Sequence, residues 1–247
     1  MQADSSGHDV GGVVVRRGRR VSDPFRFDRQ LLEEGAAAES SRDLRLAGAD
    51  EAGRGCLAGP LVAAAVVFDY AAASFRGLER LTDSKLMTPE ARERAYPVIL
   101  GAASRVSWVA FAPATIDRIG LHRCNLSALG AALDSLRGEY SLAVVDGFDL
   151  KRPELMARPI VGADYKSATV AAASVVAKVV RDRLMKSLAP EYPQYGFEEH
   201  VGYATGRHKE ALRNHGPCTL HRLSFHGVST VQLGLWDDPE ALGQAIR

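Results

Sequence analysis

The most restrictive feature of this 247-residue sequence is a pair of apolar segments separated by a short glycine-rich stretch. Residues 44–50 and the Ala- and Val-rich residues 61–68 have the composition of buried strands. Between them stand Gly53, Gly55 and Gly59-Pro60, which are typical of a turn. We therefore expect two tightly joined strands where the folded domain begins.

Strands and helices alternate further along the chain. Apolar residues alternate with polar ones in 105–111, and shorter apolar segments predict strands at 142–146 and 159–162. Helices are expected from the Thr88-Pro89 start to about Pro97, over 121–136, over 167–188, and from the Thr205 cap to Gly216-Pro217. This order predicts an α/β fold with a mixed sheet and helices on its faces. A dinucleotide-binding fold is disfavoured, because Gly53-Arg54-Gly55 lacks the third glycine of that motif.

The two ends of the chain differ from this central part in composition and in hydrophobic periodicity. Residues 1–43 mix Gly, Ser, Ala and Arg without periodicity, so we expect a disordered tail with at most a short helix at 27–34. Its basic stretch, 16–20, is interpreted as part of this flexible extension rather than as a nucleic-acid contact. We place a catalytic domain at 44–228 and a second tail, with at most a short helix, at 229–247.

Composition excludes several classes of protein. No stretch approaches the roughly 20 apolar residues that cross a bilayer, and the amino terminus does not resemble a signal peptide, so a cytoplasmic protein is expected. The three cysteines lie far apart without a C-x-x-C pair, which argues against a disulfide framework or a zinc site. A net charge of +1 means that any contact with nucleic acid depends on local basic patches.

The chemistry of the sequence lies in acids at the ends of predicted elements. Asp50 and Glu51 close the first strand, Asp146 closes a later strand, and Asp164 directly precedes the long helix. If the sheet brings these positions together, the repulsion between carboxylates is relieved by a hard divalent ion such as Mg²⁺ or Mn²⁺. Two such ions support hydrolysis of a phosphodiester. A single aspartate at a strand end, such as Asp146, is usually a turn former or a cap, whereas the consecutive Asp50 and Glu51 after a buried strand are harder to explain by structure alone.

The sequence around these acids resembles that of the ribonuclease HII family. The matching segments run in order over most of the chain: DEAGRG at 50–55, LAGP at 57–60, DSK at 83–85, VVDG at 144–147, GADYKSATVAAASVVAKVVRDRLM at 162–185, YPQYGFEEHVGYATGRHKEAL at 192–212, GPC at 216–218 and HRLSF at 221–225. The resemblance implies a ribonuclease H-like fold, with a mixed five-stranded sheet flanked by helices and a helical extension near the carboxyl end. It also implies a monomer that cuts the RNA-containing strand of an RNA/DNA hybrid, or of duplex DNA with one embedded ribonucleotide, on the 5′ side of the ribonucleotide.

The resemblance further implies roles for particular residues. Asp50, Glu51, Asp146 and Asp164 correspond to the catalytic, metal-binding acids, with two Mn²⁺ or Mg²⁺ ions as cofactors. The substrate-binding positions are Gly53, Arg54, Gly55, Lys85, Lys166 and Tyr203. The Gly-Arg-Gly loop contacts the sugar–phosphate backbone at the ribonucleotide, and Tyr203 stacks on the sugar of the following deoxynucleotide. Lys178 is assigned either to phosphate contact or to a structural ion pair. Ser84 and Ser167 are interpreted as cap or turn residues.

Three positions depart from the family pattern. Cys56 follows the Gly-Arg-Gly loop where proline is usual, Phe148-Asp149 replaces a polar or basic pair, and Tyr165 replaces a small residue. None of these removes a predicted ligand. Competing functions are another ribonuclease H-like nuclease, of type HIII or type I, and a catalytically inactive protein that only binds RNA–DNA junctions. Cleavage of a duplex in the presence of Mg²⁺ separates the inactive binder from the enzymes.

Overall fold

The computed structural model describes residues 23–36, 44–79 and 81–232, and its centre is one five-stranded sheet. The strands are β1 (Arg45–Ala52), β2 (Leu61–Asp69), β3 (Arg105–Phe111), β4 (Leu142–Asp146) and β5 (Ala157–Ile160). Their order across the sheet is β3-β2-β1-β4-β5; β1 runs antiparallel to β2 and parallel to β4. The expected mixed five-stranded sheet is confirmed.

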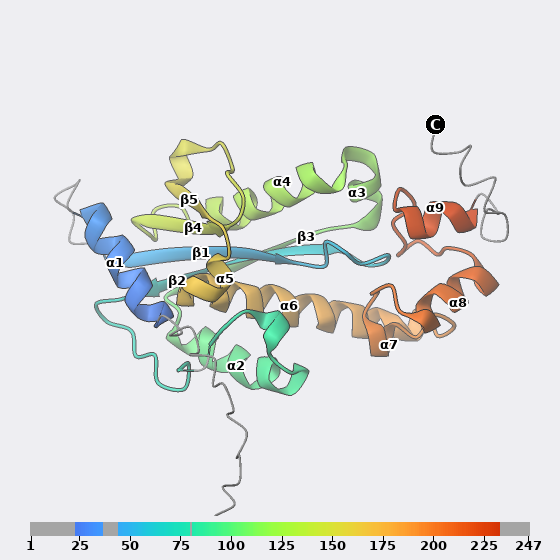
Figure 1. Ribbon diagram of the computed structural model, residues 1–247, viewed down its shortest axis with the longest axis horizontal. Helices are drawn as coiled ribbons and strands as arrows, with labels where there is room; N and C mark the ends of the chain where they lie inside the picture. Colours follow the sequence, from blue (N-terminus) through green and yellow to red (C-terminus); the bar gives the residue numbers. More distant parts are fainter. Residues whose placement is uncertain (1–22, 37–43, 80, 233–247) are drawn as a thin grey trace, which may run out of the picture.

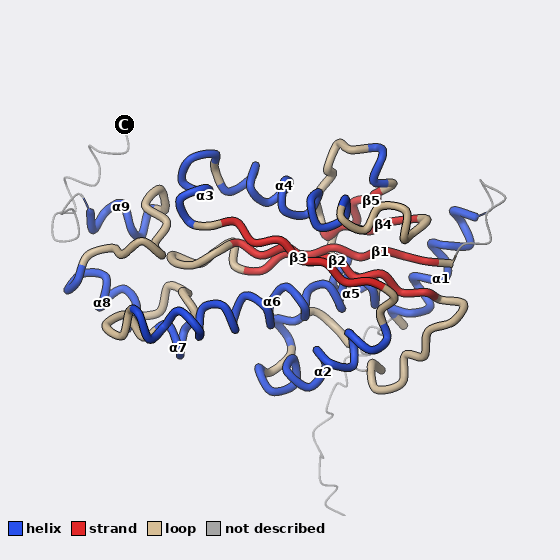
Figure 2. The backbone as a smooth tube through the Cα atoms, turned by 180° about the vertical axis from the view of Figure 1, so that it is seen from behind, coloured by secondary structure: helices blue, strands red, loops and turns tan. Residues whose placement is uncertain are grey.

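Helices cover both faces of this sheet and extend beyond one end of it (Figures 1 and 2). In chain order they are α1 (Pro24–Ala36), α2 (Pro89–Ala102), α3 (Pro113–Ile119), α4 (Leu121–Asp134), α5 (Ala163–Lys166), α6 (Ala168–Leu188), α7 (Phe197–His200), α8 (Gly206–His215) and α9 (His226–Gln232). The helix α4 packs on one face, and α6, with α1 and α2 near it, packs on the other. The helices α7, α8 and α9 form a carboxyl-terminal lobe at the end of the sheet (Figure 1).

Alternation along the central strands determines which side chain meets which helix. In β1, Leu46 packs in the core under α6, whereas Ala47 packs in the core under α4. β2 is buried on both faces, which explains its unbroken apolar sequence. Gly48 lets α6 approach β1 closely, because a Cβ atom at this position would lie 2.4 Å from the backbone of Thr169.

Several elements differ from those expected: β5 is Ala157–Ile160 instead of 159–162, and α3 was not expected. α2 does not end near Pro97 but continues to Ala102, because Pro97 lies on the exposed side of the helix while Ile99 is buried in the core. Residues 24–36 form α1, which contains the short helix expected at 27–34 but is longer, and they place Leu31 and Leu32 in the core. The tail assigned to 1–43 is therefore corrected for this segment.

The remaining predictions for the chain ends, at 1–22, 37–43 and 233–247, lie outside the described residues. The first residues of the segment assigned to a carboxyl-terminal tail, 229–232, belong to α9. Within the described residues, no helix is both long and apolar enough to span a membrane.

Candidate active site

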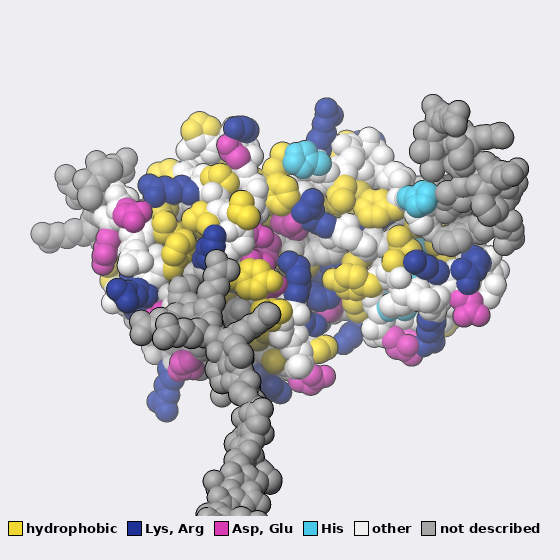
Figure 3. Space-filling view, in the orientation of Figure 1, with side chains coloured by type: hydrophobic (Ala, Val, Ile, Leu, Met, Phe, Trp, Pro, Cys, Tyr) yellow, Lys and Arg dark blue, Asp and Glu magenta, His cyan; other side chains and the backbone are white. Residues whose placement is uncertain are grey.

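The sheet brings three of the predicted acids together. β1 and β4 are adjacent and parallel, with Ala49 paired to Val145, so the last residues of both strands lie next to each other. Asp50 and Glu51 therefore stand beside Asp146, the final residue of β4. Figure 3 shows acidic side chains near the middle of this face of the molecule, with Lys and Arg side chains around them.

Asp164 reaches the same region through the short helix α5. Gly162 precedes this helix in the left-handed conformation, with a φ of 67°. The backbone N–H of Ala163 donates to Asp146 Oδ1 at 2.8 Å, which ties the start of α5 to the end of β4. Asp164 Oδ2 lies 3.6 Å from the Nζ atom of Lys85. All four acids predicted from the sequence thus lie in one region.

Asp50 and Glu51 point to opposite faces of the sheet, as consecutive strand residues must. Asp50 is on the α6 face; burial raises its pKa well above the usual value, Glu51 raises it further, and Ser174 on α6 opposes the shift. Glu51 is on the α4 face, and its Oε1 atom accepts a hydrogen bond from Arg54 Nη1 at 3.4 Å. Burial raises the pKa of Glu51 in spite of that cation.

Asp164 shows the electrostatic strain of this cluster most clearly. Burial first, then the negative charges of Asp146 and Asp83, raise its pKa from 3.8 to about 6, while Lys85 opposes the shift. The Lys85 side chain is 72% exposed, so water screens its charge and it compensates the acids poorly. The cluster therefore carries excess negative charge in a poorly solvated place.

The unpaired oxygens of the cluster fit a divalent cation. Within the described residues, Asp50 Oδ2, Glu51 Oε2, Asp83 Oδ2 and Asp164 Oδ1 are buried without a hydrogen-bond partner. Such atoms are costly unless an ion or water satisfies them, and carboxylate oxygens are the ligands that Mg²⁺ and Mn²⁺ prefer. The described side chains do not already group three ligands around one metal position. A cation bound here would therefore need water, substrate oxygens or a change of rotamer to complete its coordination.

Two polar residues in this region were missed by the sequence reasoning. Asp83 is fully buried and caps the 3₁₀ turn Ser84–Leu86 by accepting the backbone N–H of Lys85 at 2.9 Å. In that D-S-K segment the sequence assigns Lys85 to substrate and Ser84 to a cap or turn, and gives Asp83 no role. Asn125 on α4 is fully buried and helps to lower the pKa of Glu51, yet its amide atoms make no well-aligned hydrogen bond among the described residues. Its signal was a single amide within an apolar helical face.

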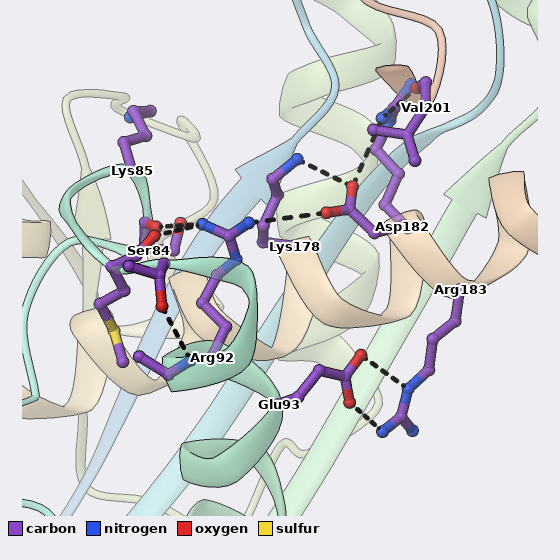
Figure 4. Close-up of polar contacts among 12 residues, drawn as sticks. Ser84, Lys85, Arg92, Glu93, Lys178, Asp182, Arg183 and Val201 are labelled. Atoms are coloured by element: carbon purple, nitrogen blue, oxygen red, sulfur yellow. Dashed lines mark hydrogen bonds and ion pairs between the residues drawn. The ribbon is translucent and has the colours of Figure 1, made fainter. Parts of the chain in front are cut away.

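The turn that carries Lys85 is held by contacts on its inner side (Figure 4). Ser84 Oγ lies 2.8 Å from Ser174 Oγ, and Arg92 Nη1 donates to the Ser84 carbonyl at 2.8 Å. The Nη2 atom of Arg92 also lies 3.9 Å from Oδ2 of Asp182 on α6. Ser84 is therefore a turn residue, as expected, and the turn presents Lys85 to solvent beside the acids.

The other two lysines differ in their availability. Lys178 Nζ lies 2.8 Å from Asp182 Oδ1 and 4.7 Å from the centre of the Tyr203 ring, and its side chain is only 12% exposed. These contacts favour the structural ion pair over a phosphate contact. Lys166 is exposed and donates to the Val161 carbonyl at 2.7 Å, which leaves other N–H groups free for an anion.

The two glycines of the Gly-Arg-Gly loop have different roles. Gly53 has a φ of 93°, and a Cβ atom there would lie 2.0 Å from Arg181 Nε, so the fold itself requires glycine. Gly55 is exposed, and a Cβ atom there would meet nothing within 4 Å. No packing within the described residues explains a glycine at position 55, which is consistent with a ligand approaching its backbone.

Tyr203 lies beside this loop, with 40% of its side chain exposed. The carbonyl of Gly202 accepts the backbone N–H of Leu57 at 3.0 Å. Arg222, fully buried, donates to the Arg54 carbonyl at 3.0 Å. The Gly-Arg-Gly loop and the turn that carries Tyr203 are therefore joined through the carboxyl-terminal lobe.

The residues that depart from the family pattern lie around the site. Cys56 is buried, and the Phe148 ring lies 4.8 Å from the guanidinium carbon of Arg54. Tyr165 is half exposed on α5, next to Asp164 in sequence. Asp149 Oδ2 pairs with Lys151 Nζ at 2.7 Å, two residues further on. Phe148 is thus the departure that contacts the Gly-Arg-Gly loop, and Tyr165 is the one that adjoins a predicted ligand.

Comparison with proteins of known structure identifies the fold class of the chain. The fold is that of a ribonuclease H-like protein: the crystal structure of the ribonuclease H2 from Pyrococcus horikoshii OT3 superposes with a TM-score of 0.64 at 27% identity, covering 77% of this chain and 98% of that one. A structure of Bst-RNase HIII in complex with Mn²⁺ has a TM-score of 0.61 at 20% identity, covering 82% and 73%, and supports the fold alone.

The sequence comparisons identify the family. The Ribonuclease HII family model matches residues 47–228. The ribonuclease HII of Salinispora tropica is 47% identical over 188 residues, which cover 76% of this chain and 68% of that protein. That of Xanthobacter autotrophicus is 44% identical over 221 residues, covering 90% and 84%. The chain belongs to the ribonuclease HII family.

Proposed function

We propose that this protein is a divalent-metal-dependent endoribonuclease that hydrolyses the RNA-containing strand of RNA/DNA hybrids. It cuts 5′ to ribonucleotides, including a single ribonucleotide in duplex DNA, and leaves 3′-hydroxyl and 5′-phosphate ends. The supporting observation is the cluster of buried carboxylate oxygens without a hydrogen-bond partner, joined to the Gly-Arg-Gly loop by the 3.4 Å contact between Glu51 Oε1 and Arg54 Nη1. The catalytic domain covers residues 44–228 together with α1.

The acids act as ligands in this proposal. Asp50, Glu51, Asp146 and Asp164 would hold two Mg²⁺ or Mn²⁺ ions, which when bound activate water and stabilise the leaving oxygen. Asp146 also orients α5, because its Oδ1 atom accepts the N–H of Ala163.

The substrate is selected by groups around the acids. The backbone at Gly53, Arg54 and Gly55 meets the ribonucleotide, and the 2′-hydroxyl is the group that distinguishes RNA from DNA there. The exposed ammonium groups of Lys85 and Lys166 contact phosphates. The Tyr203 ring stacks on the sugar of the following deoxynucleotide.

The test is cleavage of three labelled duplexes, mapped at nucleotide resolution with Mg²⁺ or Mn²⁺: DNA with one embedded ribonucleotide, a continuous RNA/DNA hybrid, and DNA alone. We expect one cut 5′ to the embedded ribonucleotide, cuts within the hybrid and none in DNA. Cleavage of the hybrid alone would replace the proposal by a type I activity. Binding without cleavage would leave an inactive junction-binding protein.

A further inference from the structure

A chain of buried histidines in the carboxyl-terminal lobe ends on the residue that we assign to junction recognition. His200, His208 and His221 are each at least nine-tenths buried. His208 Nε2 lies 3.0 Å from His221 Nε2, and His208 Nδ1 lies 2.8 Å from the carbonyl oxygen of Tyr203. None of these rings belongs to the acid site.

The hydrogen-bond partners leave only one arrangement of protons. The backbone N–H of Cys218 donates to His221 Nδ1 at 3.0 Å, so His221 carries its proton on Nε2. That N–H donates to His208 Nε2, which must be unprotonated. His208 therefore carries its proton on Nδ1 and donates it to the Tyr203 carbonyl. Every nitrogen of these two rings is used, so neither offers a free ligand to a metal.

Both imidazoles of the chain are neutral at physiological pH. Burial lowers the pKa of His208 and of His221 to about 4, and the neighbouring His200 acts in the same direction. The titratable groups that face the two rings are His200, stacked on His208 at 4.4 Å, with Tyr195 and Cys218 against His221. A neutral chain with fixed tautomers is a rigid spacer.

The spacer connects the two parts of the site that contact substrate. His221 acts on Tyr203 through His208, and the next residue, Arg222, donates to the carbonyl of Arg54 in the Gly-Arg-Gly loop. Two consecutive residues thus reach both elements from one short segment of backbone. These side-chain links act beside the backbone bond from Leu57 N–H to the Gly202 carbonyl, and they hold the Tyr203 carbonyl itself.

We propose that His208 and His221 are positioning residues for junction recognition: their neutral hydrogen-bonded chain holds the Tyr203 backbone at a set distance from the Gly-Arg-Gly loop. This inference rests on the proposed role of Tyr203. If that distance determines specificity, a variant in which it varies should cleave the duplex with a single ribonucleotide less well. A continuous hybrid should be affected less, because it can place a ribonucleotide in the Gly-Arg-Gly loop at many positions along its length.

The variants His208→Leu and His208→Asn test the proposal. Leucine removes the donor to Tyr203, whereas the asparagine amide can replace Nδ1–H. We expect His208→Leu to lower kcat/KM for the single-ribonucleotide duplex, relative to the continuous hybrid, by about tenfold, equivalent to about 1.4 kcal/mol. His208→Asn restores most of the ratio. His215 is on the same helix but is not part of the hydrogen-bonded pair of His208 and His221, so the control His215→Leu leaves the ratio unchanged.

The outcomes separate this inference from the proposed function. Equal loss on both substrates after His208→Leu, or an unchanged ratio, overturns the positioning role. If Tyr203→Ala does not change the ratio, the role of Tyr203 itself fails. Nitrogen-15 spectra of the unsubstituted protein provide a test that does not depend on variant folding. They should show His208 protonated on Nδ1 and His221 on Nε2. The opposite tautomers would refute the hydrogen bonds proposed from His221 through His208 to the Tyr203 carbonyl.

Discussion

Replacing Asp164 by asparagine should stabilise the metal-free protein while it abolishes cleavage. The pKa of Asp164 is raised from 3.8 to about 6 by burial and by the charges of Asp146 and Asp83. A folded-state pKa above the unfolded value means that the native protein binds this proton more tightly, so its stability falls as pH rises from about 4 to above 6. A shift of about two units corresponds to a penalty of about 3 kcal/mol at pH 7.5, and about half of that at pH 5.

The assay is urea unfolding in the presence of EDTA at the two pH values. Asp164→Asn should raise the unfolding free energy by up to about 3 kcal/mol at pH 7.5, or the Tm by roughly 6 to 12 °C. The gain should shrink by about half at pH 5. Asp149→Asn is the control, because Asp149 is exposed and pairs only with a neighbouring lysine, so it should bring no gain.

Two results would refute this reasoning. An Asp164→Asn protein that is no more stable than the parent at pH 7.5 would show that the cluster is not strained without metal. A gain of equal size at both pH values would assign the effect to packing instead of charge.

Other predictions concern the loop and the acids. Gly55→Ala should leave the unfolding free energy within about 0.5 kcal/mol of the parent but weaken cleavage of the single-ribonucleotide duplex, since only a ligand would meet the added methyl group. Gly53→Ala should unfold more easily by more than about 1 kcal/mol, because its Cβ would collide with Arg181; equal stability of both variants in urea would contradict the division between them. Asp50→Asn or Asp146→Asn should abolish hydrolysis and keep duplex binding within several-fold, measured by fluorescence anisotropy, and normal turnover with saturating Mg²⁺ would exclude the ligand role. Cys56→Pro should preserve cleavage, because it removes only one long hydrogen bond of 3.3 Å to Gly53; a large loss of rate would show that the loop depends on this cysteine.

The parts of the fold that depend on local chemistry could be predicted from the sequence. Ser167 and Thr205 cap α6 and α8 as expected, by accepting backbone N–H groups three residues ahead. The strand over 105–111 has the expected limits, because alternation marks a half-buried strand. The helix end predicted at Pro97 was wrong. The cost of a proline inside a helix depends on which side of the helix faces water, and only the tertiary structure shows that side.

The site was predictable only in part for a similar reason. The four acids that we propose as metal ligands stand at the ends of elements, where a sequence reveals them, and the structure brings them together. Asp83 was missed because its burial depends on a turn that packs under α6. Long-range contacts, such as the one between Arg222 and the Arg54 carbonyl, have no local signal, because 168 residues separate the partners.

The most direct test of the central claim is to locate the metal. Crystals grown with Mn²⁺ should give an anomalous difference peak surrounded by carboxylate oxygens of Asp50, Glu51, Asp146 and Asp164. A second peak is expected when an uncleavable duplex with one modified ribonucleotide is bound. Manganese peaks elsewhere on the protein, with none among these acids at saturating Mn²⁺, would contradict the account of the site.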